Sequence, residues 1–297
     1  MPISSDILIE ISTWARSKQV TQAQALDAVR KKYLILLSDI MQMPVICYFA
    51  NFKHPLSNID LSDVHSFMGM LKDLNGDSLC LFIHSPGGSF DATDELVQYL
   101  HSKFKNIEAI VPLHAFSCAT LLTCACSKIY MGKQSCLGPI DPQMPFVNIN
   151  GQVSYTAAQD ILDQFETAKI DCANSHKNIF AWQPILQQYA PAFLRQCEVA
   201  KERSRELAKS WLKTYQGLNS TDARQVANWL VDRKKHNSHG RPLCFSDLKS
   251  KKMNVFPLED NQKLQDIVLS LLHTYMFSIG SHAKIIENSV GRIQVVA

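Results

Sequence analysis

Two short stretches, each at the end of an apolar run, constrain the fold of this chain more than any other feature. The first, Ser85-Pro86-Gly87-Gly88, follows the apolar run 79–83. That run has the length and composition of a buried strand. Pro86 fixes φ and removes one N–H, whereas the two glycines allow unusual φ values and close approach of the backbone. Acidic residues within 91–95 then mark the start of a helix. The sequence therefore predicts a strand, a glycine turn and a helix.

The second stretch, Ala115-Phe116-Ser117-Cys118-Ala119-Thr120, repeats this layout. It follows a strand candidate at 107–111, and an apolar segment of helical length, 119–126, comes after it. A lone serine at the start of a helix is usually an N-cap. Here, however, a glycine turn lies one strand–helix unit upstream, at the corresponding end of a predicted parallel sheet. Such a turn can aim backbone N–H groups at a developing negative charge. We therefore interpret Ser117 as a nucleophile candidate and the glycine turn as an oxyanion loop.

Strands and helices alternate through the first half of the chain. Residues 1–43 are expected to be helical, and the strand candidates after them are 45–49, 79–83, 107–111 and 128–131. The helices expected between these strands predict right-handed crossovers and a parallel sheet. After residue 156 the strand signal fades, and the helix candidates are 157–170, 191–215, 222–231 and 264–279. The chain thus divides into a helical segment (1–43), an α/β core (44–155) and a mainly helical region (156–297) packed on the core.

Composition suits a globular protein without a strongly charged partner. Hydrophobic residues make up 46% and charged residues 19% of the 297 residues, and the net charge is +3 with histidine neutral. This balance does not indicate nucleic-acid binding. The nine cysteines form no C-x-x-C pair and lie largely in apolar segments. They favour a reduced, cytoplasmic protein with no zinc or redox site. We expect no cofactor.

Two uncharged stretches, 109–127 and 267–283, approach the length of a membrane span. A spanning helix needs about 20 mainly apolar residues. Both stretches are interrupted by polar side chains, and the first also contains Pro112. We therefore expect core helices and no transmembrane segment. The N-terminus also lacks the pattern of a secretory signal.

Three motifs together resemble a known family. They are HSPGG (84–88), AFSCAT (115–120) and YMGKQSCLGPIDPQ (130–143), and the GPIDPQ portion (138–143) is the most specific. HSPGG resembles the oxyanion stretch of the Clp protease proteolytic subunit. The full pattern resembles the serine dehydrogenase proteinase family, a branch allied to signal peptide peptidase A within the Clp/crotonase superfamily. The similarity is dense over 44–143 and weaker through 182–194.

The resemblance implies an α/β fold in which β-β-α units form a Clp/crotonase-like spiral with helical N- and C-terminal extensions. It also implies a serine endopeptidase that acts on peptide or protein substrates and assembles as a homo-oligomer. The N–H groups of Gly88 and Cys118 would hold the oxyanion, and Gly87 would shape the turn. The apolar face of 264–279 is expected to be core or a subunit interface. As an interface it would add to the expectation of self-association, because a lone domain would expose it.

The general base is the part of the site that the sequence leaves open. The Clp subunit has its histidine in the region that matches GPIDPQ, which contains none. Signal peptide peptidase relatives use a lysine, which must lose its charge through burial or a cationic neighbour. Lys169 is our first choice, against the competing interpretation of a solvated helix lysine. Lys128 and Lys133 are weaker candidates. A lysine base would make activity rise toward alkaline pH.

Histidine and aspartate residues near these motifs offer further interpretations. His114 is close to Ser117 in sequence and is the alternative base. Asp141 lies between two prolines and either orients a base or caps the next segment. His236 and His239 lie in a polar stretch with Gly240 and Pro242, which favours a surface loop.

Two other functions remain open at this point. A catalytically silent scaffold of the same fold is compatible with the unassigned base. A crotonase-like acyl-CoA enzyme would use the same oxyanion geometry on a thioester enolate. The position of Ser117 and the GPIDPQ motif argue against the second of these.

Overall fold

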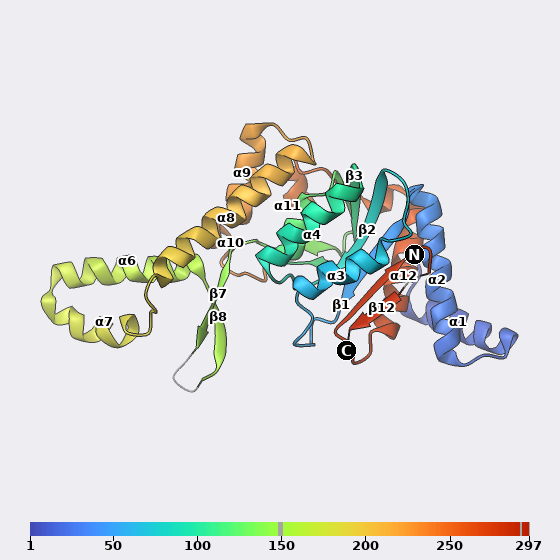
Figure 1. The fold of residues 1–297 in the computed structure, drawn as a ribbon, viewed down its shortest axis with the longest axis horizontal. Coiled ribbons are helices and arrows are strands. Elements are labelled where there is room, and N and C mark those ends of the chain that lie inside the picture. Colours follow the sequence, from blue (N-terminus) through green and yellow to red (C-terminus); the bar gives the residue numbers. More distant parts are fainter. Residues whose placement is uncertain (148–150, 292, 297) are drawn as a thin grey trace.

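A seven-stranded sheet forms the centre of the molecule (Figure 1). The computed structural model describes residues 1–147, 151–291 and 293–296. The strand order is β10-β5-β3-β2-β1-β11-β12. Their bounds are β1 (Val45–Ala50), β2 (Ser78–His84), β3 (Asn106–Val111), β5 (Lys128–Met131), β10 (Val255–Pro257), β11 (Lys284–Asn288) and β12 (Ile293–Val296). The strands from β10 to β1 run parallel, and β11 and β12 are antiparallel to their neighbours. The four strands expected in the first half of the chain, and their parallel pairing, are confirmed.

Helices cover both faces of this sheet, which explains the continuous apolar runs of its central strands. Along β1 all six residues are buried. Ile46 and Tyr48 face one hydrophobic cluster, which also includes side chains of α3 (Leu61–Met70), α4 (Phe90–Lys103) and α5 (Cys118–Cys124). Cys47 and Phe49 face the opposite cluster, which includes side chains of α2 (Gln22–Met41) and α12 (Gln262–Ser278).

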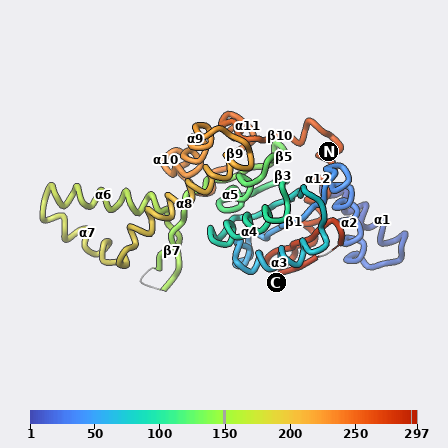
Figure 2. The backbone as a smooth tube through the Cα atoms, turned by 45° about the horizontal axis from the view of Figure 1, so that its top comes forward, coloured from blue at the N-terminus to red at the C-terminus, as the bar shows by residue number. Residues whose placement is uncertain are grey.

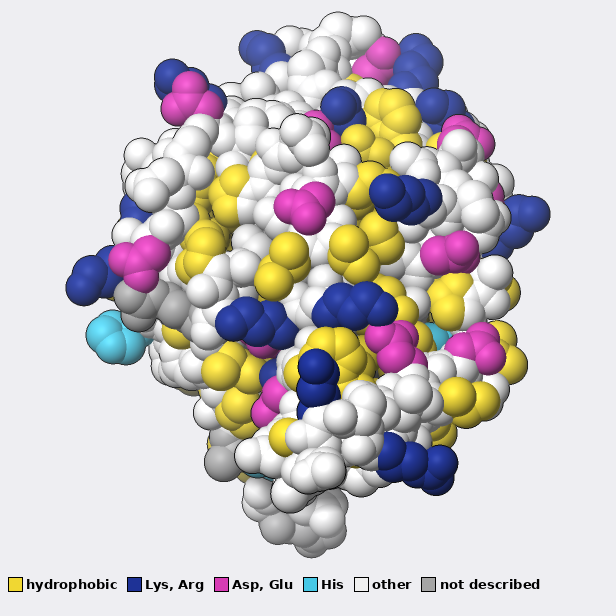
Figure 3. Space-filling view, turned by 90° about the vertical axis from the view of Figure 1, so that its right-hand side faces the viewer, with side chains coloured by type: hydrophobic (Ala, Val, Ile, Leu, Met, Phe, Trp, Pro, Cys, Tyr) yellow, Lys and Arg dark blue, Asp and Glu magenta, His cyan; other side chains and the backbone are white. Residues whose placement is uncertain are grey.

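The N-terminal helices form as the sequence predicts. Helix α1 spans Ser4–Lys18, and α2 begins after Thr21, whose hydroxyl accepts the Gln24 N–H in a capping box. Figure 3 shows this end of the molecule, where Lys, Arg, Asp and Glu side chains are interspersed with hydrophobic ones. No strong field of one sign is visible there, in keeping with the small net charge.

Of the two roles expected for the apolar face of α12, core or subunit interface, the structure shows the core. Leu271 and Tyr275 are fully buried, and α12 packs against α2 and the sheet within the same chain. This face therefore gives no argument for self-association. Among the described residues, no helix combines the length and apolar character needed to span a membrane.

The second half of the chain is mainly helical as expected, but it also supplies strands that the sequence did not predict. Its helices are α6 (Ala158–Asn174), α7 (Ile179–Leu186), α8 (Phe193–Thr214), α9 (Ser220–Leu230), α10 (Arg233–His236) and α11 (Phe245–Ser250), besides α12. Strands β10, β11 and β12 join the main sheet. The sequence of β11 hides its nature because Lys284 and Glu287 are charged, yet both are buried.

Smaller elements connect the sheet to a projecting arm. Strands β4 (His114–Ala115), β6 (Cys136–Leu137) and β9 (Leu243–Cys244) form a three-stranded sheet, and β7 (Gln143–Val147) and β8 (Val153–Ala157) form a hairpin. We define the arm as residues 158–192, which comprise α6, α7 and the link to α8. Both ribbon views show the arm extending away from the body of the molecule (Figures 1 and 2). A small cluster around Ile161, Phe193 and Cys197 joins its base to α8.

Candidate active site

The two stretches singled out in the sequence meet at the ends of β2 and β3. Ser85 extends β2 and pairs in parallel with Ala115. The Ser85 N–H donates to the His114 carbonyl, and the Phe116 N–H donates to the Ser85 carbonyl, both at 3.0 Å. The glycine turn and the Ser117 turn are therefore joined by backbone hydrogen bonds just before each turn begins.

Gly87 lies directly against the Ser117 turn. Its φ of 100° belongs to the left-handed region. A Cβ at this position would stand 2.6 Å from the Phe116 carbonyl oxygen, 2.7 Å from the Ser117 Cβ and 2.9 Å from the Cys118 nitrogen. No side chain fits there, so glycine is required both by conformation and by space. This contact brings the glycine turn beside the candidate nucleophile.

Gly88 is held on its other side by Ile59. The Ile59 N–H donates to the Gly87 carbonyl at 2.7 Å, and the Ser89 N–H donates to the Ile59 carbonyl at 2.8 Å. A Cβ on Gly88 would lie 2.2 Å from that carbonyl oxygen. Because the peptide group is planar and trans, the Gly88 N–H points away from Ile59. Among the hydrogen bonds of the described residues, none is donated by this N–H.

Ser117 has a strained backbone. Its φ is 51° and its ψ is −120°, an unusual conformation for a residue other than glycine. Its hydroxyl makes no capping hydrogen bond to α5, so the N-cap interpretation finds no support. Such strain costs about 1–3 kcal/mol and persists where the surrounding structure imposes it. All seven residues of α5 are buried, which provides that rigid support.

Cys118 follows Ser117 and begins α5. In the described part of the chain its backbone N–H, like that of Gly88, donates no hydrogen bond to a backbone or side-chain acceptor. Its thiol donates to the Gly88 carbonyl at 3.0 Å. Burial raises the pKa of this thiol to about 11. The thiol therefore stays protonated at neutral pH and braces Gly88 rather than competing with Ser117 as a nucleophile.

His114 lies in an aromatic cluster. Its ring stacks on Phe116 with centroids 5.1 Å apart and also contacts Phe52 and His84. Burial lowers the pKa of His114 from its ordinary value. Within the described residues, no hydrogen bond connects the His114 ring to Ser117. The structure therefore does not join this histidine to the nucleophile.

Asp141 has a partner that the sequence did not reveal. It is buried, and its carboxylate accepts hydrogen bonds from Gln143 Nε2 and from His239 Nδ1, both at 2.8 Å. The GPIDPQ segment packs on the nucleophile turn, because a Cβ at Gly138 would lie 3.0 Å from the Phe116 ring. His239 lies in a loop and is partly exposed, as the sequence indicated, but it is also anchored to this segment, with 30% of its side chain exposed. No local pattern links two residues so far apart in the chain.

Lys169 lies on α6 in the arm. Its side chain is 57% exposed and its ammonium is 3.0 Å from the Glu166 carboxylate. A lysine base needs burial or a cationic neighbour, whereas the Lys169 side chain is exposed and lies beside a carboxylate. In Figure 1 this helix extends away from the sheet. The structure of a single chain thus shows no contact between Lys169 and Ser117. Lys128, a weaker candidate, is the first residue of β5 and pairs with Glu108. The glycine turn follows the last residue of β2, so Lys128 lies at the opposite end of the parallel strands.

A family comparison agrees with this geometry. The family of ClpP-like SDH-type serine proteinases matches residues 57–286. The chain belongs to this family. The resemblance noted in the sequence is thereby confirmed, and the mixed α/β fold with helical terminal parts agrees with it.

Two relatives match only a short part of this chain. Two uncharacterized proteins of Methanocaldococcus jannaschii, MJ0137 and MJ1495, are 39% and 34% identical to it over 64 residues. Each match covers 22% of this chain and 22% of the relative. The matched part thus spans about a fifth of the length of these relatives.

Solved structures of proteases show a low overall similarity. Two mutants of the 1510-N membrane-bound stomatin-specific protease are 15% identical with a TM-score of 0.41. The first comparison covers 71% of this chain and 79% of that one; the second, a complex with a substrate peptide, covers 80% and 83%. A mutant ClpP1 of Listeria monocytogenes is 12% identical with a TM-score of 0.39, over 77% of this chain and 99% of that one.

A cavity of about 550 Å³ lies beside the glycine turn of this proteinase-family chain. Phe90 and Asp91, which follow the turn at the start of α4, form one wall, and Met144 of β7 forms another. Helix α8 closes it with Val199 and other side chains between residues 192 and 203. Its lining combines apolar side chains with the charged residues Asp91, Arg195 and Arg203, which is the usual make-up of a ligand pocket.

Proposed function

We propose that this chain is a serine endopeptidase with Ser117 as its nucleophile. The observation that carries the proposal is the contact of Gly87 with the strained Ser117 turn, next to two backbone N–H groups without acceptors in the described structure. Membership of a serine proteinase family supports it. The substrate would be a peptide or protein whose carbonyl lies between Ser117 and these N–H groups.

In the proposed reaction the Ser117 Oγ attacks the carbonyl carbon of the scissile peptide bond. A base takes the Oγ proton as the C–O bond forms and then passes a proton to the leaving amine. The N–H groups of Gly88 and Cys118 donate to the oxygen that becomes negative, and each such donor is typically worth about 10²–10³ in kcat. Water then hydrolyses the acyl-enzyme. Because the two donors belong to the backbone, they need no reorganisation during the reaction.

Two residues compete for the role of base. Lys169 remains our family-based candidate, and it requires the arm to bend back or a second copy to supply it, since it is exposed in the single chain. The Asp141–His239 pair is favoured by one observation, the 2.8 Å bond that a carboxylate would use to orient an imidazole base. His114 is a weaker candidate for the base than His239, because its ring contacts aromatic side chains rather than a carboxylate.

We further propose that the protein works as a homo-oligomer in the cytoplasm. All nine cysteines are free thiols, which supports a reducing compartment. The arm and the adjacent hairpin expose large apolar side chains, including Phe180, Tyr155 and Ile170. An exposed apolar surface of this kind favours association with another protein surface.

A serine-directed fluorophosphonate probe tests the proposed function. Wild-type protein should be labelled and should hydrolyse casein, whereas Ser117→Ala should lose both properties and keep its melting temperature within a few degrees. A Cys118→Ala variant, whose backbone N–H is intact, should still be labelled. Absence of labelling in folded wild-type protein would favour the catalytically silent scaffold. Hydrolysis of acyl-CoA thioesters without peptide hydrolysis would favour the crotonase-like alternative.

A further inference from the structure

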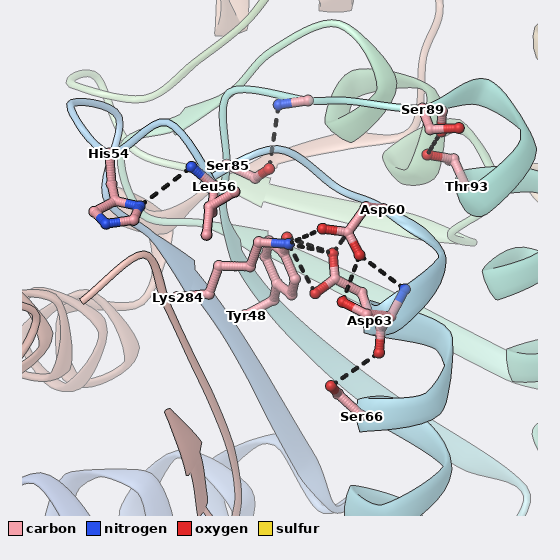
Figure 4. Close-up of polar contacts among 12 residues, drawn as sticks. Tyr48, His54, Leu56, Asp60, Asp63, Ser66, Ser85, Ser89, Thr93 and Lys284 are labelled. Carbon is pink, nitrogen blue, oxygen red and sulfur yellow. Dashed lines mark hydrogen bonds and ion pairs between the residues drawn. The ribbon is translucent and has the colours of Figure 1, made fainter. Parts of the chain in front are cut away.

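A buried cluster of charged groups lies on the far side of the glycine turn from Ser117. The Lys284 ammonium, on β11, is 1% exposed. It donates to both carboxylate oxygens of Asp63, at 2.9 and 3.0 Å, and to Asp60 at 2.9 Å. The Tyr48 hydroxyl donates to the same Asp63 at 2.9 Å. Figure 4 shows these four side chains converging from β1, β11 and the start of α3. The proposed reaction uses none of them.

The cluster is well satisfied, which makes it rigid. Asp63 is fully buried and accepts from Lys284, from Tyr48 and from the Asp60 N–H at 3.0 Å. Buried charges are strongly unfavourable unless they are paired and hydrogen-bonded. When every member of such a network has its partners, the network holds its surroundings in one arrangement. The peptide group that is held here is the one that joins Ile59 to Asp60.

Residue Ile59, whose carbonyl belongs to this peptide group, is hydrogen-bonded to the residues on both sides of Gly88. Ile59 precedes Asp60, and its N–H and C=O bind the Gly87 carbonyl and the Ser89 N–H, one on each side of Gly88. The Gly88 backbone touches Ile59 so closely that a methyl group does not fit between them. A displacement of residues 59–60 must therefore turn the Gly87–Gly88 peptide group, which carries the Gly88 N–H.

We propose that Lys284, Asp63 and Tyr48 are positioning residues that set the direction of the Gly88 N–H toward the oxyanion. This inference rests on the proposed peptidase function. Donors must lie within a few tenths of an ångström of the developing charge to stabilise it. Loss of one member should therefore lower kcat while KM changes little, because the donor acts on the transition state and not on the bound substrate.

The same strand provides a matched control. Glu287 of β11 is also buried and lies on the opposite face of the sheet. It accepts from Arg30 Nε at 2.7 Å and from the Tyr275 hydroxyl at 3.0 Å. This second cluster joins β11 to α2 and α12, away from Ile59 and the glycine turn. It should contribute to folding in a similar way without any influence on the oxyanion donor.

The pair Tyr48→Phe and Tyr275→Phe tests the inference. Each substitution removes one hydroxyl from a buried tyrosine that donates to a buried carboxylate. Tyr48→Phe should lower kcat about tenfold with unchanged KM and should slow fluorophosphonate labelling to a similar extent. Tyr275→Phe, at a comparable loss of thermal stability, should keep the wild-type kcat. Equal kcat values in the two variants would overturn the inference.

A second pair of variants tests the inference without any measurement of turnover. Lys284→Met and Arg30→Met each leave a buried carboxylate without its cation. Hydrogen–deuterium exchange at the Ile59 and Ser89 amides should be faster in Lys284→Met than in Arg30→Met. If wild-type protein proves inactive, this exchange still decides whether the cluster holds the glycine turn. Unchanged exchange at both amides in folded Lys284→Met would refute the positioning role even in an active enzyme.

Discussion

The Ser117 region and the arm that carries Lys169 differ in how their positions are fixed. Around Ser117 the backbone is fixed by hydrogen bonds from Ser85, Phe116 and Ile59, and added methyl groups have no space. In the arm, α6 buries three residues, and α7, all of which is described, buries none. The nucleophile and the oxyanion donors of the proposed site are thus preorganised within a single chain. The arm has few internal contacts to hold a base in place.

The largest effect should follow from changes at Ser117 itself. Ser117→Gly should lower peptide turnover by at least about 10⁴-fold, since only the oxyanion donors and substrate binding remain. The same variant should be more stable by about 1 kcal/mol, because glycine adopts a φ of 51° without strain. Thermal melting and casein hydrolysis measure the two effects. A variant that loses stability would show that the backbone strain is not at the serine.

The next largest effect should come from substituting the base. These variants show which residue it is and whether the arm belongs to the site. If Lys169 is the base, Lys169→Ala should reduce kcat by about 10²–10⁴-fold. The wild-type rate should then rise toward alkaline pH, because an ordinary lysine titrates near ~10.4. Lys169→Arg should not restore activity, because arginine stays protonated.

If the Asp141–His239 pair supplies the base instead, His239→Ala should be inactive. The wild-type rate should then change with pH in the range where an ordinary histidine titrates, near ~6.5. His114→Ala should retain most activity in either case. Wild-type rates measured between pH 5 and 10, together with these variants, separate the two assignments. Full activity in both Lys169→Ala and His239→Ala would contradict both.

Two glycines, one beside Ser117 and one in the hairpin next to the arm, offer a third test. Gly88→Ala should lower kcat by about 10²–10³-fold, because its methyl group would lie 2.2 Å from the Ile59 carbonyl and displace the donor. Gly151, in the hairpin next to the arm, also has a positive φ but has open space around it. Gly151→Ala should therefore cost only about 1 kcal/mol of stability and leave kcat unchanged. Similar kcat values for the two variants would contradict the oxyanion role of Gly88.

The Ser117 region should also be the acid-sensitive one. His84 ends β2, and burial, with the neighbouring His114, lowers its pKa to about 3. The His84 Nδ1 lies 3.2 Å from the His114 carbonyl oxygen and 3.3 Å from the His114 backbone nitrogen. Because the unfolded state binds the His84 proton more readily, this residue should make stability fall as pH drops below ~6.5, by about 1.4 kcal/mol per unit. Burial also lowers the pKa of His101 and His236, so denaturant titrations should show a shallower slope in His84→Gln than in wild type, not a flat one.

The sequence predicted the centre of this fold and missed its buried charges. Strands 79–83 and 107–111 were predictable because both faces of each are buried, which makes them apolar apart from Glu108. Strand β11 was not, since Lys284 and Glu287 find their charged partners more than 200 residues away. The Asp141–His239 bond escaped prediction for the same reason. For α12 the sequence predicted a core helix or a subunit interface and did not decide between them, because periodicity shows an apolar face without showing what covers it.

The smallest effect on folding is expected at the tip of the arm. Phe180 is 79% exposed, so Phe180→Asp should change the free energy of unfolding by no more than about 0.5 kcal/mol. If the arm is the surface through which copies associate, the same change should lower the mass measured by light scattering at micromolar concentration.

Leu8→Asp, on α1 at the other end of the molecule, provides an exposed apolar control. A wild-type monomer would contradict the proposed assembly, and dissociation by Leu8→Asp alone would place the contact on the N-terminal helices. Dissociation by Phe180→Asp with loss of activity would instead tie the arm to the site, as a lysine supplied by a second copy requires.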